Sequence, residues 1–316
     1  MPISSVTVRR IYGSALLLSV LSFALVVPAC NKPAFLAREV HDSIPVPSAD
    51  TVEAIPQDTV KPLAALELLN EHYGKDSLQV MDIYLPAGRD PAVTHIMVFV
   101  HGGGWMGSDK RDYTTHIDNM KGRDAKYAYV NLNYRLVKDG KNTFPAAEED
   151  VNAALQYVWR LADSFHISPA TGIIGTSAGA HLAALQANKH NEKGYIKAAV
   201  CLLGVYDMQR FYHEGSAGVP ELAAAVLGGT PGQRTDLYLT SSPLFYVNEK
   251  TPPTLLIHGT EDTLARYSQA VAMDSALEKA GVVHELYSFK GWHAIPADKI
   301  VDAAERMFNF IEKYTK

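Results

Sequence analysis

The sequence predicts an α/β fold in which a mostly parallel central sheet carries helices on both faces. Short apolar runs, each long enough for a strand, alternate along the chain with longer amphipathic stretches that are typical of helices. Several apolar runs lead directly into glycine-rich or polar segments, as expected at the carboxyl ends of parallel strands. With 316 residues, 47% of them hydrophobic and 20% charged, the chain has enough apolar material for one such domain.

The N-terminal segment differs from the rest of the chain. A basic start is followed by an apolar run from Ile11 to Val27, then by Pro28, Ala29 and Cys30. This is the layout of a signal peptide, which we assign to residues 1–29. A cysteine directly after a small residue resembles a bacterial lipoprotein signal. We therefore expect an exported protein that a lipid on Cys30 anchors to a membrane of a bacterial cell envelope, on the periplasmic or surface side. An uncleaved membrane helix is the alternative, for which the run is short.

A tether and a single catalytic domain are expected after this anchor. Residues 30–60 are rich in proline, aspartate and serine, as linkers often are, and the domain then covers 61–316. Cys201 lies in an apolar run and is expected to be buried, so no disulfide is predicted. A net charge of −5 gives no basic surface for phosphate backbones, and we exclude nucleic acid as a partner.

The order of the elements places the loops that carry polar side chains. The expected strands are 78–85, 95–100, 128–132, 172–174, 198–203, 254–257 and 285–289. The expected helices are 146–165, 178–188, 267–280 and 297–314. Open α/β sheets bind ligands beyond the carboxyl ends of their strands, so the candidate site lies in the loops that follow these strands.

The loop after the strand at 172–174 contains the pattern G-x-S-x-G. Gly175 and Gly179 flank Ser177, and a predicted helix follows at once. A sharp turn between strand and helix strains the serine backbone and crowds its neighbours, which must then be small. The pattern is short enough to occur by chance, but its position between a strand and a helix indicates that Ser177 is a nucleophile.

The loop after the strand at 95–100 reads His101 to Trp105, with three consecutive glycines between them. Bare glycine backbone lets amide groups point into a cavity, as an oxyanion hole for acyl transfer requires. A flexible turn and a phosphate cradle are the alternatives. The phosphate cradle is disfavoured because the lysine of a phosphate-binding loop does not follow.

Two further loops supply an acid and a base. Asp262 follows the strand at 254–257, and His293 follows the last strand, which completes the chain order serine, aspartate, histidine. Asp207 and Glu261 remain alternatives to Asp262 as the acid.

The other histidines and charges are expected to be structural. His101 shapes the glycine loop, His181 is a core histidine on the helix after Ser177, and Arg135 with Asp150 fixes a loop. No spacing of histidine and acidic residues fits a metal site, so we expect no metal and no cofactor.

These motifs together resemble the α/β-hydrolase fold, specifically the group of hormone-sensitive-lipase-like carboxylesterases and bacterial carbohydrate esterases. The resemblance runs from about Leu66 to Tyr314. It rests on the following matches: the oxyanion loop at 101–105, the Asn-Tyr-Arg-Leu turn at 133–136, the segment Phe144 to Asp150, and Ser177, Asp262 and His293. The family commonly has Val-Pro where this chain has Ala265-Arg266, and Gly-Phe where it has Ala294-Ile295. Both differences lie in loops near the pocket, so the substrate stays open.

The resemblance implies a serine hydrolase mechanism. Ser177 would attack an ester carbonyl, His293 would take its proton and return it, and Asp262 would hold the imidazole. The amides of Gly103, Gly104 and Ala178 would form the oxyanion hole. We further assign Trp105 and Trp292, the aromatic residues of two site loops, to substrate binding.

Residues 207–251 form an insertion before the acid-bearing strand, and in this family such insertions usually cap the active site. Its aromatic residues suit stacking on a sugar or aryl ring. For most of them, however, packing between helices and the sheet is the better expectation.

Hydrolysis of small-molecule or polysaccharide esters, either short-chain acyl esters or acetyl and feruloyl esters, is the leading function. An amide hydrolase of the arylformamidase type is the second reading, because the segment from Ser177 to Leu182 also resembles those enzymes. Export argues against it, since their substrates are cytosolic. A binding protein on a hydrolase scaffold is the third reading, and the presence of Ser177, Asp262 and His293 argues against it.

Overall fold

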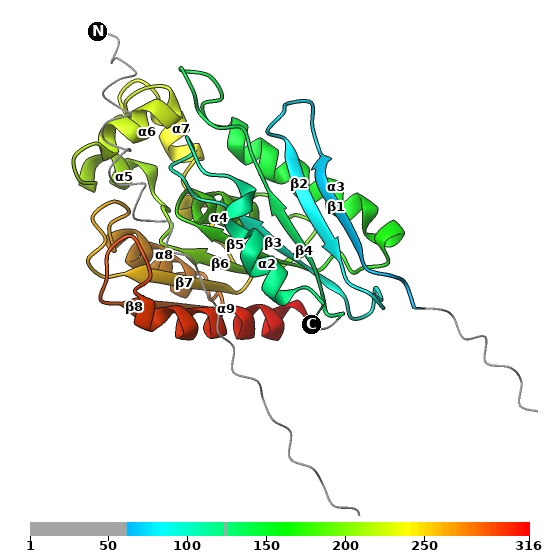
Figure 1. Cartoon of the computed structure of the whole chain (residues 1–316). Coiled ribbons are helices and arrows are strands. Elements are labelled where there is room, and N and C mark those ends of the chain that lie inside the picture. The colour runs from blue at the N-terminus through cyan, green and yellow to red at the C-terminus, as the bar shows by residue number, and fades with distance from the viewer. Residues whose placement is uncertain (1–61, 123–124) are drawn as a thin grey trace, which may run out of the picture.

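The computed structural model describes residues 62–122 and 125–316, in which one sheet of eight strands forms the centre of the molecule (Figure 1). Their order across the sheet is β1-β2-β4-β3-β5-β6-β7-β8. The strands are β1 (Leu66–His72), β2 (Val80–Leu85), β3 (His95–Val100), β4 (Tyr127–Leu132), β5 (Thr171–Thr176), β6 (Ile196–Leu202), β7 (Thr254–Gly259) and β8 (His284–Phe289). Strands β3 to β8 run parallel to one another, and β2 is antiparallel to both of its neighbours. The predicted fold class is confirmed.

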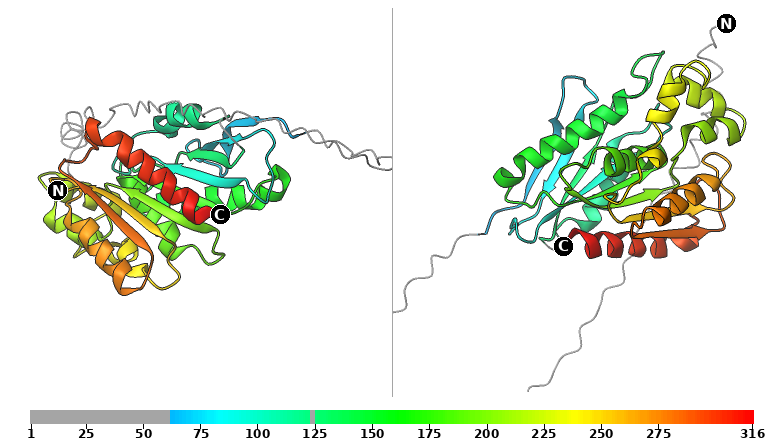
Figure 2. Two further views of the ribbon diagram at one scale, coloured as in Figure 1. Left: turned by 90° about the horizontal axis from the view of Figure 1, so that it is seen from below. Right: turned by 180° about the vertical axis from the view of Figure 1, so that it is seen from behind.

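Helices cover both faces of the sheet (Figure 2). The helices α2 (Thr114–Met120) and α9 (Ile300–Thr315) pack on one face. The helices α3 (Ala146–Phe165), α4 (Ala178–Lys189) and α8 (Ser268–Lys279) pack on the other.

The sheet has a core on each side because its strands are apolar on both faces. In β3, Ile96, Val98 and Val100 pack into the core on the α3 side, and Met97 and Phe99 pack into the core on the α9 side. Successive side chains of a strand point to opposite faces, so an almost continuous apolar run is what a strand buried on both faces requires.

The seven predicted strands and four predicted helices all occur, with ends shifted by three residues or fewer. The last predicted helix starts with a separate 3-10 turn, η4 (Ala297–Lys299), before α9 begins. The edge strand β1 and the helix α2 had not been predicted. Strand β1 is largely exposed and carries polar residues on both faces, so no apolar run marks it.

The insertion folds into short helices between β6 and β7. These are α5 (Met208–Glu214), α6 (Val219–Leu227), α7 (Thr235–Thr240) and the 3-10 turn η3 (Pro243–Tyr246), of which α5, α6 and α7 gather at one end of the molecule (Figure 1). Phe211, Leu222 and Tyr238 are buried, whereas Phe245 is 54% exposed. The expectation that most of these side chains pack inside the protein is confirmed.

The predicted signal peptide, the predicted lipid site Cys30 and the predicted tether lie outside the described residues, as does residue 61, the first of the predicted domain. Within 62–122 and 125–316, no helix is both long and apolar enough to cross a membrane. Cys201 is buried and unpaired, as predicted.

Candidate functional site

The turn that carries Ser177 is strained and tightly packed. Ser177 has φ 55° and ψ −117°, between the last residue of β5 and the first residue of α4. A Cβ on Gly175 would overlap the carbonyl oxygen of Gly179, and a Cβ on Gly179 would overlap the carbonyl oxygen of Val100 in β3. The two glycines therefore allow the turn to close and allow β3 to lie beside it. Backbone strain of this kind is typical of positions where a side chain must be presented to a ligand.

A methyl group at Gly179 is expected to destabilise the protein by about 3 kcal/mol, because the added atom meets backbone that cannot move aside. The measurement is urea-induced unfolding of the Gly179→Ala variant at neutral pH. Gly232→Ala is the matched control, since its Cβ would have no atom within 4 Å. Equal unfolding midpoints for the two variants would show that the turn tolerates the methyl group.

The glycine loop follows β3 and lies against the nucleophile turn. A Cβ on Gly102 would approach the Ser177 Cβ to 3.4 Å, so the backbone of this loop passes directly beside the nucleophile. Gly103 and Gly104 have φ values of 91° and 60°. In the turns and loops of the described residues, the backbone N–H groups of Gly103, Gly104 and Ala178 donate no hydrogen bond to another backbone group. Their assignment to an oxyanion hole is compatible with this and stays a prediction.

Tyr134 fixes the shape of the glycine loop. It is fully buried, and its hydroxyl donates to the carbonyl oxygens of His101 at 3.0 Å and Gly102 at 2.9 Å. Its ring stacks on the His101 imidazole with 4.3 Å between the ring centroids. The predicted structural role of His101 is confirmed.

A buried ion pair anchors the chain that leaves this loop. Lys110 Nζ lies 2.6 Å from Asp82 Oδ2, and both side chains are 6% exposed. The backbone N–H of Lys110 also donates to Asn133 Oδ1 at 2.6 Å. This pair had not been predicted. Asp82 stands in an apolar strand, and that buried acidic position was the available signal for it.

Ser177, His293 and Asp262 are joined by hydrogen bonds, although they come from three separate loops. The Nε2 atom of His293 lies 2.8 Å from Ser177 Oγ, and its Nδ1 atom lies 2.6 Å from Asp262 Oδ2. Asp262 is buried, while the other two side chains are partly exposed. Because the carboxylate can only accept, Nδ1 carries the hydrogen and Nε2 is free to accept the serine proton.

The carboxyl group of Asp262 is held ionised despite its burial. Desolvation by burial acts to raise its pKa, but hydrogen bonds and charge interactions with His258 and His293 outweigh it and lower the pKa to about 2. Because the folded-state pKa lies below the unfolded value of 3.8, the stabilisation is complete above pH 3.8 and is lost as the pH falls towards 2. An ionised Asp262 at neutral pH is what an orienting acid requires.

The two alternative acids do not reach His293 in the described structure. Asp207 caps the N-terminus of α5, where Oδ1 accepts from the backbone N–H groups of Gln209 and Arg210. Glu261 is exposed and lies 3.7 Å from Lys290. The geometry therefore selects Asp262.

The two tryptophans assigned to substrate binding lie in different surroundings. Trp105 is only 2% exposed, its indole N–H donates to His181 Nδ1 at 3.2 Å, and its ring packs edge-on against Phe211. A side chain enclosed in this way has no surface left for a ligand, so the assignment of Trp105 was wrong. Trp292, next to His293, is 72% exposed and stays a candidate contact.

His181 links the glycine loop, the nucleophile helix and the insertion. Its Nδ1 accepts from Trp105, and its Nε2 donates to the Ser241 carbonyl oxygen at 2.6 Å. Both ring nitrogens are satisfied only by the neutral imidazole. This confirms that His181 is a core residue.

Arg135 fixes its loop, as predicted, through several hydrogen bonds to Asp150.

The burial of His181 predicts a loss of stability in acid. Desolvation lowers its pKa from 6.5 to about 4. Between these two pH values the imidazole is protonated in the unfolded chain and neutral in the folded protein. The contribution of the neutral His181 to the free energy of unfolding is therefore complete above pH 6.5 and decreases as the pH falls to 4, by roughly 3 kcal/mol in all. Denaturant unfolding at pH 7.5 and 4.5 should show a smaller decrease for His181→Gln than for the unmodified protein. His213→Gln, at an exposed position, should leave the decrease unchanged. The same decrease in all three proteins would contradict this prediction.

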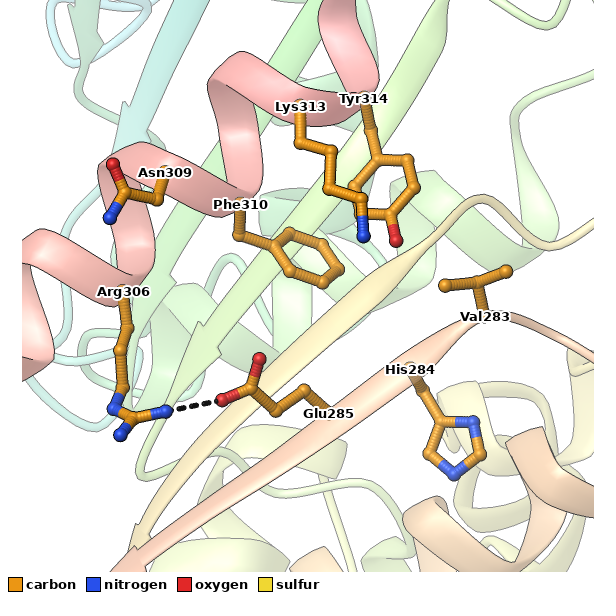
Figure 3. A pocket seen from close by; sticks show the side chains of 8 residues that line it. All are labelled: Val283, His284, Glu285, Arg306, Asn309, Phe310, Lys313 and Tyr314. Carbon is orange, nitrogen blue, oxygen red and sulfur yellow. Dashed lines mark hydrogen bonds and ion pairs between the residues drawn. The ribbon is translucent and has the colours of Figure 1, made fainter.

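A hollow at the edge of the sheet lies apart from these residues (Figure 3). It is lined by the start of β8 and by α9, and the ion pair between Arg306 and Glu285 crosses one side of it. His293 follows the other end of β8, which at the usual rise per residue is roughly 15 to 20 Å away. The hollow is therefore not part of the candidate site. Within 62–122 and 125–316, no three His, Cys, Asp or Glu side chains are grouped so that they could hold a metal ion.

The parallel sheet with its antiparallel β2, the serine turn between β5 and α4, and the acid and base in loops after β7 and β8 define an α/β-hydrolase. The chain belongs to the BD-FAE family, whose profile matches residues 81–277.

Curated relatives and solved structures agree with this classification. Esterase LipQ of Mycobacterium tuberculosis is 28% identical over 214 residues, which cover 64% of this chain and 49% of that protein. The chain spans about half the length of the curated relatives LipQ, LipC and LipM that it matches. A carbohydrate esterase from gut microbiota, solved in truncated form, has a TM-score of 0.64 at 22% identity and covers 78% of this chain and 96% of its own. The esterase Est2 of Thermogutta terrifontis has a TM-score of 0.61 at 21% identity, with 79% and 91% covered.

Proposed function

We propose that this protein hydrolyses carboxylic esters through an acyl-enzyme on Ser177. The observation that carries the proposal is the continuous line of hydrogen bonds from Ser177 through His293 to Asp262, beside a loop with free backbone amides. Membership of the BD-FAE family and the similarity to named esterases support the same reaction.

Each residue has a definite part in this reaction. The Ser177 hydroxyl attacks the ester carbonyl and His293 Nε2 takes its proton, so that a tetrahedral oxyanion forms at the amides of Gly103, Gly104 and Ala178. His293 then protonates the leaving alcohol, which leaves an acyl group on the serine. A water molecule then attacks the acyl carbonyl while His293 Nε2 takes its proton, and a second oxyanion forms. When this oxyanion collapses, the bond to Ser177 Oγ breaks, the carboxylic acid leaves, and His293 returns the proton to the serine. Asp262 stays ionised and stabilises the imidazolium that forms in each half of the reaction.

The substrates proposed are short acyl esters or acyl esters of carbohydrates. Support comes from Trp292, an exposed aromatic ring next to the base, which suits stacking on a sugar or aryl ring. One similar solved structure is a carbohydrate esterase, and another is an acetyl ester and xyloside hydrolase. The discriminating experiment is a panel of aryl esters of rising acyl length, run beside acetylated xylan, feruloylated sugars and N-formylkynurenine. Hydrolysis of N-formylkynurenine alone would favour the arylformamidase reading.

Covalent labelling tests the proposal directly. A fluorophosphonate probe should modify the folded protein at Ser177, because the probe reacts with a serine activated by a base. Peptide mass spectrometry identifies the modified residue. A folded protein that stays unlabelled would instead support a binding protein on a hydrolase scaffold.

We also propose that the protein is exported and anchored by a lipid on Cys30. The support is the sequence alone: the basic start, the apolar run at 11–27 and the cysteine after Ala29. Expression of the full chain in a bacterium with a radioactive fatty acid should label the protein, and Cys30→Ala should abolish the label. An unlabelled protein would contradict the anchor.

A further inference from the structure

A second histidine, His258, lies behind the acid of the triad. It is the next-to-last residue of β7, is fully buried, and precedes Asp262 by four positions. Its Nε2 atom lies 2.7 Å from the carbonyl oxygen of Ala265 and 3.4 Å from Asp262 Oδ2. A carbonyl oxygen only accepts, so Nε2 carries the hydrogen and donates it to Ala265, with the Asp262 carboxylate as a close neighbour.

His258 closes the turn that carries the acid. Asp262 Oδ1 accepts from the backbone N–H groups of Leu264 at 2.9 Å and Ala265 at 3.0 Å. Ala265 is thus held at both of its polar groups, its N–H by Asp262 and its carbonyl by His258. With Oδ1 occupied in this way, Oδ2 is the oxygen left to face His293.

The position of the imidazole is not explained by stability alone. Its Nδ1 atom is buried and has no hydrogen-bond partner within the described residues. A buried polar atom without a partner destabilises a fold, so Nδ1 itself gives no reason for an imidazole at this position. What an apolar side chain cannot supply is the N–H group directed at the acid turn.

We propose that His258 is a positioning residue of the triad: its Nε2–H holds the turn 262–265 by donating to Ala265, and its imidazole lies against Asp262 Oδ2. Together these contacts fix the carboxylate that orients His293. The inference rests on the proposed function. His258 touches neither Ser177 nor the substrate, and it acts only through Asp262.

Three substitutions separate positioning from simple packing. In His258→Gln, the side-chain amide nitrogen can take the place of Nε2 and donate to Ala265. In His258→Asn, the amide is too short to reach, and in His258→Leu the donor is absent. For an aryl acetate, we expect His258→Leu and His258→Asn to lower kcat roughly 10- to 100-fold with little change in KM, by analogy with residues that orient the ligands of a catalytic metal. His258→Gln should stay within a few-fold of the unmodified protein.

Folding is checked by circular dichroism and thermal unfolding. If His258→Leu does not fold, the comparison of Asn with Gln decides. Equal kcat values for those two variants would overturn the proposal, as would an unaltered kcat in a folded His258→Leu.

A spectroscopic measurement separates this inference from the proposed function. The proton on His293 Nδ1 should give a low-field NMR resonance because of its short bond to Asp262, and the resonance should move or disappear in His258→Leu and persist in His258→Gln. An unmoved resonance in all variants would overturn the role of His258 whether or not the protein hydrolyses esters. Conversely, an unlabelled Ser177 in the unmodified protein would contradict the proposed function without touching this result.

Discussion

Replacing Ser177 by alanine should lower kcat for an aryl acetate by about a million-fold, because the variant has no hydroxyl that could form the acyl-enzyme. The change removes one oxygen and keeps the Cβ, so the turn between β5 and α4 should remain folded. The measurement is the initial rate of phenol release, corrected for the uncatalysed reaction. A small residual rate is expected, since the amides of the glycine loop can still stabilise an oxyanion that water forms.

Ser164→Ala is the matched control for this prediction. Ser164 is an exposed residue near the end of α3, and its replacement should leave kcat unchanged. Thermal unfolding of both variants should agree with that of the unmodified protein to within a few degrees. Retained hydrolysis by Ser177→Ala would mean that another group is the nucleophile.

Asp262→Asn should lower kcat by about 10⁴-fold, because the amide presents the wrong hydrogen-bonding group to the imidazole. The Asn oxygen can still accept from the backbone N–H groups of Leu264 and Ala265, which leaves the amide nitrogen facing His293. His293 must then offer Nδ1 as an acceptor and carry its hydrogen on Nε2. In that tautomer Nε2 cannot take the proton of Ser177.

The same chemical change at Asp207 provides the control. Asp207 is also nearly buried, but it caps α5, a task that asparagine performs equally well. Asp207→Asn should therefore stay within a few-fold of the unmodified kcat. If Asp207→Asn were the more damaging of the two, the acid would have been assigned to the wrong loop.

Much of the fold could be predicted because its strands are marked by local patterns. The strands β3 and β7 are apolar on both faces, and such runs are visible without knowledge of their neighbours. The edge strand β1 could not be predicted in this way. It pairs with β2 through backbone hydrogen bonds, which leave no pattern in the side chains.

The parts of the candidate site that could be predicted are likewise those that local motifs mark. The strained turn at Ser177 needs glycines at fixed spacing, and the oxyanion loop needs bare backbone, so both are recognisable as short motifs. The choice between Asp262 and Asp207 was open until the distances to His293 were known. Trp105 follows a site loop in the sequence, yet its ring turns into the core because His181 and Phe211 offer it partners there.

The sequence by itself determined the class of sheet, the nucleophile turn, the glycine loop and the set of residues from which the acid and base come. These features depend on backbone conformation and on the period of apolar residues, which are properties of neighbouring residues along the chain. The tertiary structure alone decided which acid faces the base, that Lys110 pairs with Asp82, and that His258 lies behind Asp262. Such contacts depend on where separate loops meet in space, and hydrogen bonds and ion pairs act over a few ångströms regardless of distance along the chain.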